Sequence, residues 1–283
     1  MSWKDKFPKG NRYFETDSGI LYLGDATEIL AMLPDNEVDL MITSPPYNIG
    51  IKYENWNDRM PWDKYFEWTE KWLRESFRVI KSVGGRACIN HYLSLGSGAR
   101  GNKIGSKQGN NQGLWYDSNR LAPLMEINSI CSRIGYKHHS VVVWEDITLS
   151  RKTAWGSWLS ASSPYINSPY EGILINFKDV WKKDGDGMNT INEKDFVSLT
   201  RGIWEIGTDS SPYTVATFPI KLPVNCINLL TYVNDLVIDP FVGSGTTGIA
   251  AEKMGRRWIG IEISEKYAKI ASRRISEASM SLF

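Results

Sequence analysis

The chain has 283 residues, 42% of them hydrophobic and 23% charged, which suits one large domain or one domain with an insertion. Its 33 Lys and Arg against 32 Asp and Glu give a net charge of +1, which excludes binding to nucleic acid through bulk positive charge alone. No apolar run is long enough to span a membrane and no signal peptide is visible, so we expect no membrane contact. Three widely spaced cysteines fit a reducing cytosol better than a disulfide framework.

Strands and helices alternate in the first third of the chain. Residues 19–23 and 38–43 predict strands, and residues 26–33 have the composition of a helix. Apolar residues recur at three- and four-residue steps over 62–80, which predicts an amphipathic helix, and residues 86–90 predict the next strand. This alternation favours a parallel α/β sheet.

The middle of the chain is less regular. Residues 119–134 predict a helix, and residues 141–144 and 173–177 predict buried strands. Residues 94–119 hold six glycines, and residues 178–192 are polar and rich in turn formers. Both segments predict mobile or substrate-facing loops.

The last quarter predicts a strand, a glycine turn, a helix and a second strand, which together form a βαβ unit. The strand covers 236–238, the helix 247–254 and the second strand 257–263, with a closing helix over 265–275. The turn between them, Gly243 to Gly248, has the spacing GxGxxG.

The glycine turn carries the first signal for a ligand. Glycines let a backbone approach a ligand closely, and Glu262, nineteen residues after Gly243, can bind ribose hydroxyls. Asp239 and Phe241 place a carboxylate and an aromatic ring before the turn, which suits a cationic adenosine ligand such as S-adenosylmethionine better than a pyrophosphate. A nicotinamide-dependent oxidoreductase and a plain strand-to-helix turn also fit the glycines.

Residues 43–47 (TSPPY) form the most specific motif of the chain. Two prolines stiffen the backbone so that the Pro45 carbonyl can point into a pocket beside the Ser44 hydroxyl. The ring of Tyr47 can stack on a flat ligand. On its own, the motif also fits a strand that ends in a rigid turn.

Together, the two motifs resemble those of the amino-methyltransferases of DNA. Residues 43–47 look like their catalytic SPPY or DPPY motif, and residues 239–245 look like their cofactor motif. The catalytic motif comes first in the chain, as in the circularly permuted β class. Segments around Asp25, Phe218 and Glu262 are similar to further family segments, so that the resemblance covers 20–90 and 200–275.

The resemblance implies a Rossmann-like α/β fold, circularly permuted, with a mostly parallel sheet, helices on both faces and an inserted target-recognition region. It implies catalytic roles for Ser44, Pro45, Pro46 and Tyr47. The cofactor residues that it implies are Asp25, Thr43, Phe218, Pro219, Asp239, Pro240, Phe241, Gly243, Gly245, Thr246 and Glu262. No metal site is expected.

The implied reaction moves a methyl group from S-adenosylmethionine to an exocyclic amino nitrogen of a base turned out of duplex DNA. SPPY usually accompanies cytosine N4 in this family and DPPY adenine N6, so Ser44 favours cytosine, with adenine as the alternative. Methylation of RNA or of a small molecule is a third hypothesis, and a non-catalytic DNA-binding role is a fourth.

DNA contacts are expected where positive charge gathers. Residues 76–116 hold six Lys and Arg and no Asp or Glu. We expect phosphate contacts from the basic loop over 94–119 and from the segment after residue 145. The predicted DNA-binding residues are Arg100, Lys103, Lys107, Arg151 and Lys152.

The resulting organisation has a catalytic half over 1–145, a recognition region over 146–205 and a cofactor-binding half over 206–283. Double-stranded DNA is the expected partner, together with a restriction endonuclease that acts separately. We expect a monomer or homodimer in a prokaryotic cytosol or nucleoid.

Overall fold

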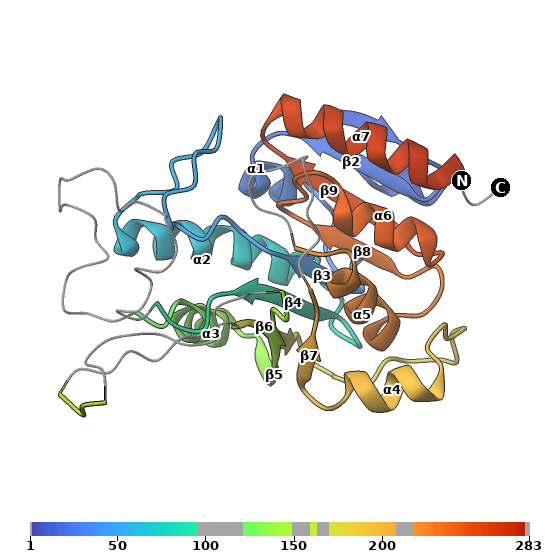
Figure 1. Cartoon of the computed structure of the whole chain (residues 1–283). Helices are drawn as coiled ribbons and strands as arrows, with labels where there is room; N and C mark the ends of the chain where they lie inside the picture. Colours follow the sequence, from blue (N-terminus) through green and yellow to red (C-terminus); the bar gives the residue numbers. More distant parts are fainter. Residues whose placement is uncertain (1, 96–120, 149–158, 163–169, 208–217, 281–283) are drawn as a thin grey trace.

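The computed structural model describes residues 2–95, 121–148, 159–162, 170–207 and 218–280. Nine strands in these ranges form one sheet with the order β1-β2-β9-β8-β3-β4-β6-β5-β7 (Figure 1). The strands are β1 (Arg12–Glu15), β2 (Gly19–Leu23), β3 (Leu40–Thr43), β4 (Arg86–His91), β5 (Lys137–Glu145), β6 (Tyr170–Phe177), β7 (Ile203–Glu205), β8 (Leu236–Asp239) and β9 (Arg257–Glu262). The helices are η1 (Trp3–Lys6), α1 (Ala26–Met32), α2 (Trp62–Val79), α3 (Pro123–Ile134), α4 (Glu193–Leu199), α5 (Lys221–Leu230), α6 (Thr246–Lys253) and α7 (Glu265–Met280).

The sheet is mostly parallel, as the sequence predicts. Five neighbouring pairs are parallel: β2 with β9, β9 with β8, β8 with β3, β3 with β4, and β5 with β7. The β1 edge strand and β6 run antiparallel to their neighbours. The strands β3, β4 and β8 are buried along their whole length, as expected for parallel strands that are covered on both faces.

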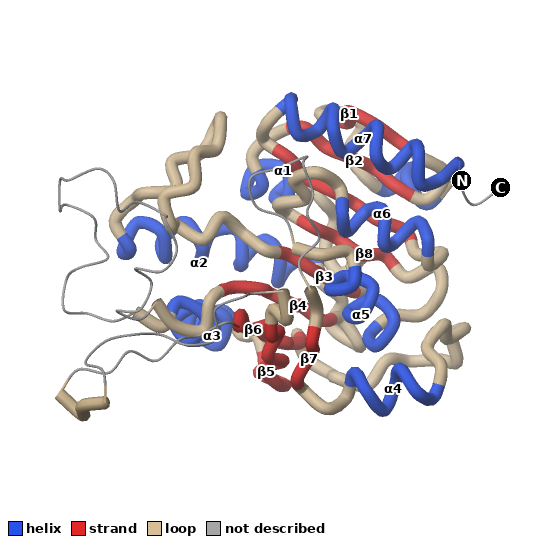
Figure 2. The backbone as a smooth tube through the Cα atoms, in the orientation of Figure 1, coloured by secondary structure: helices blue, strands red, loops and turns tan. Residues whose placement is uncertain are grey.

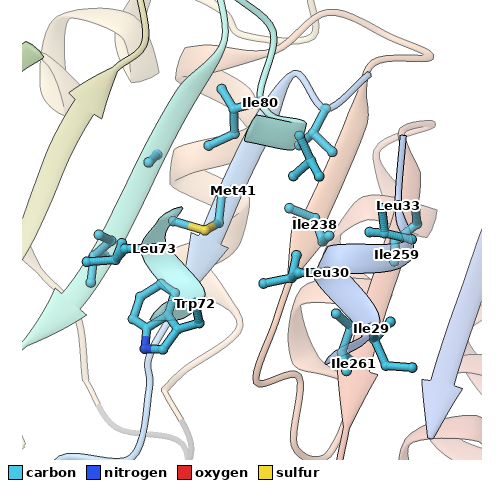
Figure 3. Packing of buried hydrophobic residues seen from close by; sticks show 14 of the residues in the cluster. Ile29, Leu30, Leu33, Met41, Trp72, Leu73, Ile80, Ile238, Ile259 and Ile261 are labelled. Carbon is cyan, nitrogen blue, oxygen red and sulfur yellow. The ribbon is translucent and has the colours of Figure 1, made fainter. Parts of the chain in front are cut away.

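Helices cover both faces of the sheet. One core cluster holds α1, α2 and α3 against the sheet, and Figure 3 shows Leu30 and Ile29 of α1 beside Ile238 and Ile261 of the strands. A second cluster holds α5, α6 and α7 against the opposite face, with Cys226 of α5 fully buried in it. The α/β class with helices on both faces is therefore confirmed.

Several elements differ from the sequence prediction. The helix predicted from residue 119 begins at Pro123, because Leu121 pairs with Leu95 in an isolated bridge and proline suits a first helical turn. Five elements were not predicted at all: η1, β1, α4, α5 and β7. Except for α5, these elements are only three to seven residues long, too short to show a clear period.

The recognition region predicted over 146–205 stays a prediction, because part of it lies outside the described residues. Strands β6 and β7, both within 146–205, belong to the same sheet as β4 and β8. The parts of 146–205 that could hold a separate recognition segment, 149–158 and 163–169, lie outside the described residues. The basic loop over 94–119 lies outside them too, apart from its first two residues.

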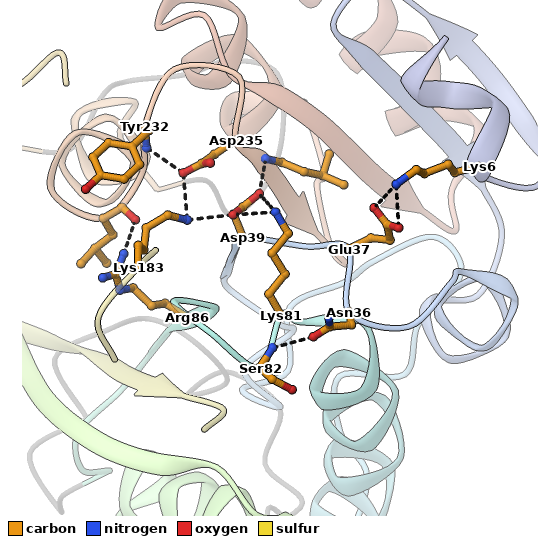
Figure 4. A network of polar contacts seen from close by, with 12 residues as sticks. Lys6, Asn36, Glu37, Asp39, Lys81, Ser82, Arg86, Lys183, Tyr232 and Asp235 are labelled. Atoms are coloured by element: carbon orange, nitrogen blue, oxygen red, sulfur yellow. Dashed lines mark hydrogen bonds and ion pairs between the residues drawn. The ribbon is translucent and has the colours of Figure 1, made fainter. Parts of the chain in front are cut away.

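Residues 178–192, predicted as a mobile or substrate-facing loop, do not line the cavity described below. Lys183 lies in an ion-pair network next to the N-terminal ends of β3 and β8 (Figure 4). Its Nζ lies 2.7 Å from Asp39 Oδ1 and 3.0 Å from Asp235 Oδ2. Lys81 also pairs with Asp39 at 2.9 Å. The two ion pairs of Lys183 anchor the segment next to the N-terminal ends of β3 and β8.

Replacing Lys183 with Met should lower the free energy of unfolding by about 3–5 kcal/mol, because it leaves the carboxylates of this network short of a positive partner. Urea denaturation at neutral pH measures the change. Lys182→Met is the control, because its side chain is exposed and its loss should change stability by less than about 0.5 kcal/mol. Equal stability of both variants would contradict a structural role for the network.

Candidate active site

The candidate site lies at the edge of the sheet where the parallel strands end. Strands β2, β9, β8 and β3 end there at Leu23, Glu262, Asp239 and Thr43, because parallel neighbours share their carboxyl edge. A cavity with about 780 Å³ of empty space, its open mouth included, lies at this edge. Its described lining is Gly24, Asp25, Ala26, Ser44, Pro46, Tyr53, Glu54, Asn55, Trp56, Trp68, Pro240, Phe241, Gly243, Ile261, Glu262, Ile263, Ser264 and Tyr267.

The cavity is acidic and aromatic. Its described lining includes Asp25, Glu54 and Glu262 but no Lys, Arg or His. Five aromatic side chains share the lining: Tyr53, Trp56, Trp68, Phe241 and Tyr267. Such a cavity favours a cation with a flat ring system and disfavours a pyrophosphate.

Glu262 ends β9 with its carboxylate held by the backbone. Oε2 accepts a hydrogen bond from the amide of Gly243 at 3.0 Å, and Oε1 accepts one from the amide of Ser264 at 2.8 Å. Burial raises the pKa of Glu262 to about 7, and these two amides offset only part of that effect. The carboxylate thus has a fixed position and titrates near neutral pH.

The glycine turn leaves room beside Glu262. Gly243 has a φ of +53°, and an added Cβ would meet only the Phe241 carbonyl oxygen, at 4.0 Å, so its Cα faces open space. Gly245 has a φ of +85° and forms the N-cap of α6. Thr246 follows it, buried, and lies 3.5 Å from Arg274 Nη1 rather than at the cavity.

The carboxylate of Asp239 is held by hydrogen bonds at the turn that follows β8. Its carboxylate accepts hydrogen bonds from the hydroxyls of Thr43 and Thr247 at 2.9 and 2.6 Å, and from the amide of Phe241 at 3.0 Å. Burial raises the pKa of Asp239 to about 6, and these donors oppose the shift. The network ties the end of β3 to the start of α6, and it places neither Asp239 nor Thr43 on the lining.

The proline loop carries a hydrogen-bond network that sequence reasoning missed. The Ser44 hydroxyl donates to Tyr47 Oη at 2.9 Å, and Tyr47 Oη donates to Glu171 Oε2 at 2.7 Å. Asn90 Nδ2 donates to both of these acceptors, at 2.6 and 2.7 Å. The Tyr47 ring also packs on His91, with ring centroids 4.3 Å apart. A path of hydrogen bonds therefore leads from the cavity wall at Ser44 to a carboxylate on β6.

The loop between β3 and α2 is a further missed part of the site. Asp58 accepts hydrogen bonds from the amides of Asn48, Ile49 and Ile51 at 2.7, 3.0 and 2.9 Å. The residues between these anchors include Tyr53 and Trp56, which line the cavity. Figure 2 shows the loop as a tan excursion that rises from the start of α2 on the side where α1 lies.

Replacing Asp58 with Ala should weaken binding of the cavity's ligand about tenfold, because three amides lose their acceptor and the cavity wall is no longer held in place. Isothermal titration of the purified variant measures this. Asp63→Ala changes an exposed carboxylate at the start of α2 and should leave affinity unchanged. Equal affinity of the Asp58 variant and the Asp63 variant would contradict the anchoring role.

The structure brings seven of the predicted residues to the cavity: Asp25, Ser44, Pro46, Pro240, Phe241, Gly243 and Glu262. The first of these also caps α1, where Asp25 Oδ1 accepts from the amides of Thr27 and Glu28. Pro45 is buried beside the cavity without lining it. Phe218 packs with the core around α5, and Pro219 is buried, so neither reaches the described lining. The predicted DNA-binding residues Arg100, Lys103, Lys107, Arg151 and Lys152 lie outside the described residues.

A family model described as DNA methylase, that of the N6/N4 methyltransferases, matches residues 38–273. The chain belongs to this DNA methylase family. The match includes the proline loop and the glycine turn, the two segments that meet at the cavity. No helix among the described residues of this methylase is long and apolar enough to cross a membrane.

Relatives and solved structures agree with the family. The chain is 33% identical over 179 residues to the type II methyltransferase M.MjaVI of Methanocaldococcus jannaschii, covering 63% of this chain and 81% of that protein. It is 28% identical to M.ScaI of Streptomyces caespitosus, covering 97% and 86%. A proposed DNA modification methylase of Thermus thermophilus, solved with S-adenosyl-L-methionine, is 26% identical with a TM-score of 0.68, covering 92% and 93%. The PvuII DNA methyltransferase, at 19% identity and a TM-score of 0.68 over 97% and 95%, supports the fold.

The methyl donor of this family, S-adenosyl-L-methionine, fits the cavity. The acidic lining suits its positive charge, and the aromatic side chains suit its adenine. Glu262 lies on the lining, its predicted bond to ribose stays a prediction, and the open face of Gly243 leaves space for the ligand. A dinucleotide would bring its pyrophosphate against three carboxylates, so this cavity does not favour the nicotinamide alternative.

Proposed function

We propose that this methylase transfers a methyl group to the exocyclic N4 of a cytosine turned out of duplex DNA, at a specific sequence. Ser44 carries this proposal, because this residue lines the cavity that we assign to the methyl donor. A small hydroxyl at this position, in an SPPY motif, resembles the cytosine enzymes of the family more than the adenine enzymes. The solved PvuII enzyme is described as cytosine-N4-specific, which agrees with this assignment.

An exocyclic amino nitrogen is a poor nucleophile because its lone pair is delocalised into the ring. When bound, S-adenosyl-L-methionine supplies an electrophilic methyl group. The task of the chain is to hold the amino group so that its lone pair faces the methyl carbon. The Ser44 hydroxyl and the Pro45 carbonyl are proposed to accept the two N–H groups, and the Tyr47 ring is proposed to stack on the base.

Adenine N6 is the second candidate target. The DNA adenine methyltransferase YhdJ of Escherichia coli is 24% identical over 290 residues, so the relatives include enzymes of both kinds. An adenine would present the same amino group to Ser44 but a larger ring system to the cavity.

DNA contacts and partners form the rest of the proposal. Arg100, Lys103, Lys107, Arg151 and Lys152 are proposed to contact phosphates, because they lie in segments rich in Lys and Arg. Because several relatives are named type II methyltransferases, we propose that the enzyme protects DNA beside a separate restriction endonuclease. We also propose the circular permutation of the β class, with which the order of β3 before β8 in the chain agrees. A role in protecting DNA agrees with a location in the prokaryotic cytosol.

The test is to express the chain in cells that lack other DNA methylases and to sequence their DNA with detection of modified bases. We expect N4-methylcytosine within one short sequence motif. N6-methyladenine in a motif would replace the first candidate by the second, and unmodified DNA from cells that contain folded enzyme would contradict both.

A further inference from the structure

Glu171 is a carboxylate at the catalytic loop that no known motif of the chain explains. It lies near the start of β6, which runs antiparallel to β4, with His91 opposite Gly172 in the register. The start of β6 therefore lies at the same edge of the sheet as the ends of the parallel strands. Glu171 reaches the proline loop from a strand 124 residues after Tyr47 in the chain.

The surroundings of Glu171 are not those of a stabilising ion pair. Its hydrogen-bond partners are the neutral Tyr47 and Asn90, and the other titratable groups near it are Tyr92 and Asp146. No Lys, Arg or His in the described part of the chain pairs with it. A partly buried carboxylate without a cation costs stability, so its position calls for a functional explanation.

The hydrogen bonds around Glu171 all run in one direction. Ser44 donates to Tyr47 and Tyr47 donates to Glu171, so each hydroxyl can accept a proton as it gives one up. Asn90 donates to both Tyr47 and Glu171 and holds the two oxygens together. Asn90 Oδ1 is buried and has no partner among the described residues, which leaves one acceptor free beside the relay.

We propose that Ser44, Tyr47 and Glu171 form a relay that carries the proton released by methyl transfer away from the amino nitrogen of the base. This rests on the proposed function. As the nitrogen bonds to the methyl carbon, the carbon–sulfur bond breaks with its electron pair left on sulfur, and the nitrogen becomes positively charged. It gives a proton to Ser44 Oγ, which passes its own proton to Tyr47 Oη, which passes its own to the Glu171 carboxylate. The products are a neutral methylated base and a neutral Glu171.

The electrostatics of the relay favour this direction. Burial raises the pKa of Glu171, which the hydrogen bonds from Tyr47 and Asn90 only partly offset, so its carboxylate is a stronger base than one in water. Burial also raises the pKa of Tyr47 well above its ordinary value, so the phenol passes a proton without persisting as a phenolate. Glu171 does not line the described cavity and acts through Tyr47, as a positioning and relay residue.

The test is the single-turnover rate of methyl transfer to duplex DNA at saturating cofactor, measured over a pH range that extends upward from the ordinary glutamate pKa. In the wild type the rate should rise with pH as Glu171 ionises, because only the carboxylate accepts a proton. In Glu171→Gln it should fall about 10²- to 10⁴-fold and lose this rise. Tyr47→Phe should show the same loss of rate. The rate of the double variant should be little lower than that of either single variant, since each substitution interrupts the same relay. Glu205→Gln, an exposed carboxylate of β7, is the matched control.

Thermal unfolding gives a second readout, which does not depend on methyl transfer. A carboxyl whose pKa is raised in the fold stabilises the protein below its unfolded pKa, and this contribution is lost as pH rises through the folded pKa. In thermal unfolding, the wild type should therefore lose stability relative to Glu171→Gln as the pH rises above the ordinary glutamate pKa. A Glu171→Gln variant within twofold of the wild-type rate, or one that keeps the pH-dependent rise, would overturn the relay. Wild-type enzyme without any methyl transfer to DNA would instead contradict the proposed function, and unfolding would still report on Glu171.

Discussion

Ser44→Ala is expected to lower the single-turnover rate of methyl transfer by about 10²- to 10³-fold at saturating cofactor and DNA. The reason is that Ser44 lines the cavity and that its hydroxyl begins the hydrogen-bond path to Tyr47. Its loss removes an acceptor for the amino group, which matters most as that nitrogen becomes positive. Rapid-quench measurement of labelled methyl groups in DNA gives the rate.

The binding of the methyl donor separates this effect from damage to the site. Alanine at position 44 removes only one oxygen and leaves the prolines in place, so the dissociation constant for S-adenosyl-L-methionine should change less than threefold. A rate within fivefold of the wild type would contradict the role of Ser44. An equal loss in rate and in donor affinity would place Ser44 in donor binding instead.

Glu262→Gln is expected to weaken binding of S-adenosyl-L-methionine about 10- to 100-fold at pH 8, the effect of losing hydrogen bonds to a charged acceptor. Gln also carries an NH₂ group where the carboxylate accepts from the amides of Gly243 and Ser264. One of those two bonds is therefore lost together with the bonds to ribose. Glu265→Gln, an exposed carboxylate in the first turn of α7, is the control and should bind normally.

The pH dependence of binding gives a second test of Glu262. Burial raises its pKa to about 7 in the free protein, and the ionised form accepts ribose hydrogen bonds best. Donor affinity should therefore fall as the pH drops through 7, by up to about tenfold per pH unit, while Glu262→Gln should show little change. A flat wild-type affinity between pH 5.5 and 8 would contradict this role. Isothermal titration over that range measures it.

The sequence was most informative where parallel strands end. Ser44 and Phe241 follow two strands that are far apart in the chain, yet both line one cavity. A predicted parallel sheet already places such ends together, because the carboxyl ends of neighbouring strands share an edge. Glu262 was predicted for the same reason, and its place on the lining agrees with that prediction.

The parts that sequence reasoning missed depend on register and on local reach. Glu171 enters the site because β6 is antiparallel, and no sequence pattern gives the direction of that strand. The available signal was a carboxylate at the start of an apolar run. Asp58 folds back on the amides of Asn48 to Ile51, a contact that follows from loop geometry rather than from any period.

Asp239 has a structural role that sequence reasoning missed, while its contact with the cofactor stays a prediction. Its place before the glycine turn suggested a contact with the cofactor, but two threonines and one amide surround its carboxylate. A short side chain at a strand end bonds most readily to its own turn. Lys183 lies in a polar, turn-rich segment that the sequence predicts to be a loop. Its ion pairs with Asp39 and Asp235 hold that segment next to the N-terminal ends of β3 and β8.

The account depends above all on the chemistry at Ser44, and one measurement tests it directly. Purified enzyme is incubated with duplex DNA and S-adenosyl-L-methionine that carries a heavy methyl label, and the DNA is digested to nucleosides for mass spectrometry. We expect the label in N4-methylcytosine, with none in a parallel reaction that contains Ser44→Ala at short times. Label in N6-methyladenine, in C5-methylcytosine or in no nucleoside at all would contradict the account.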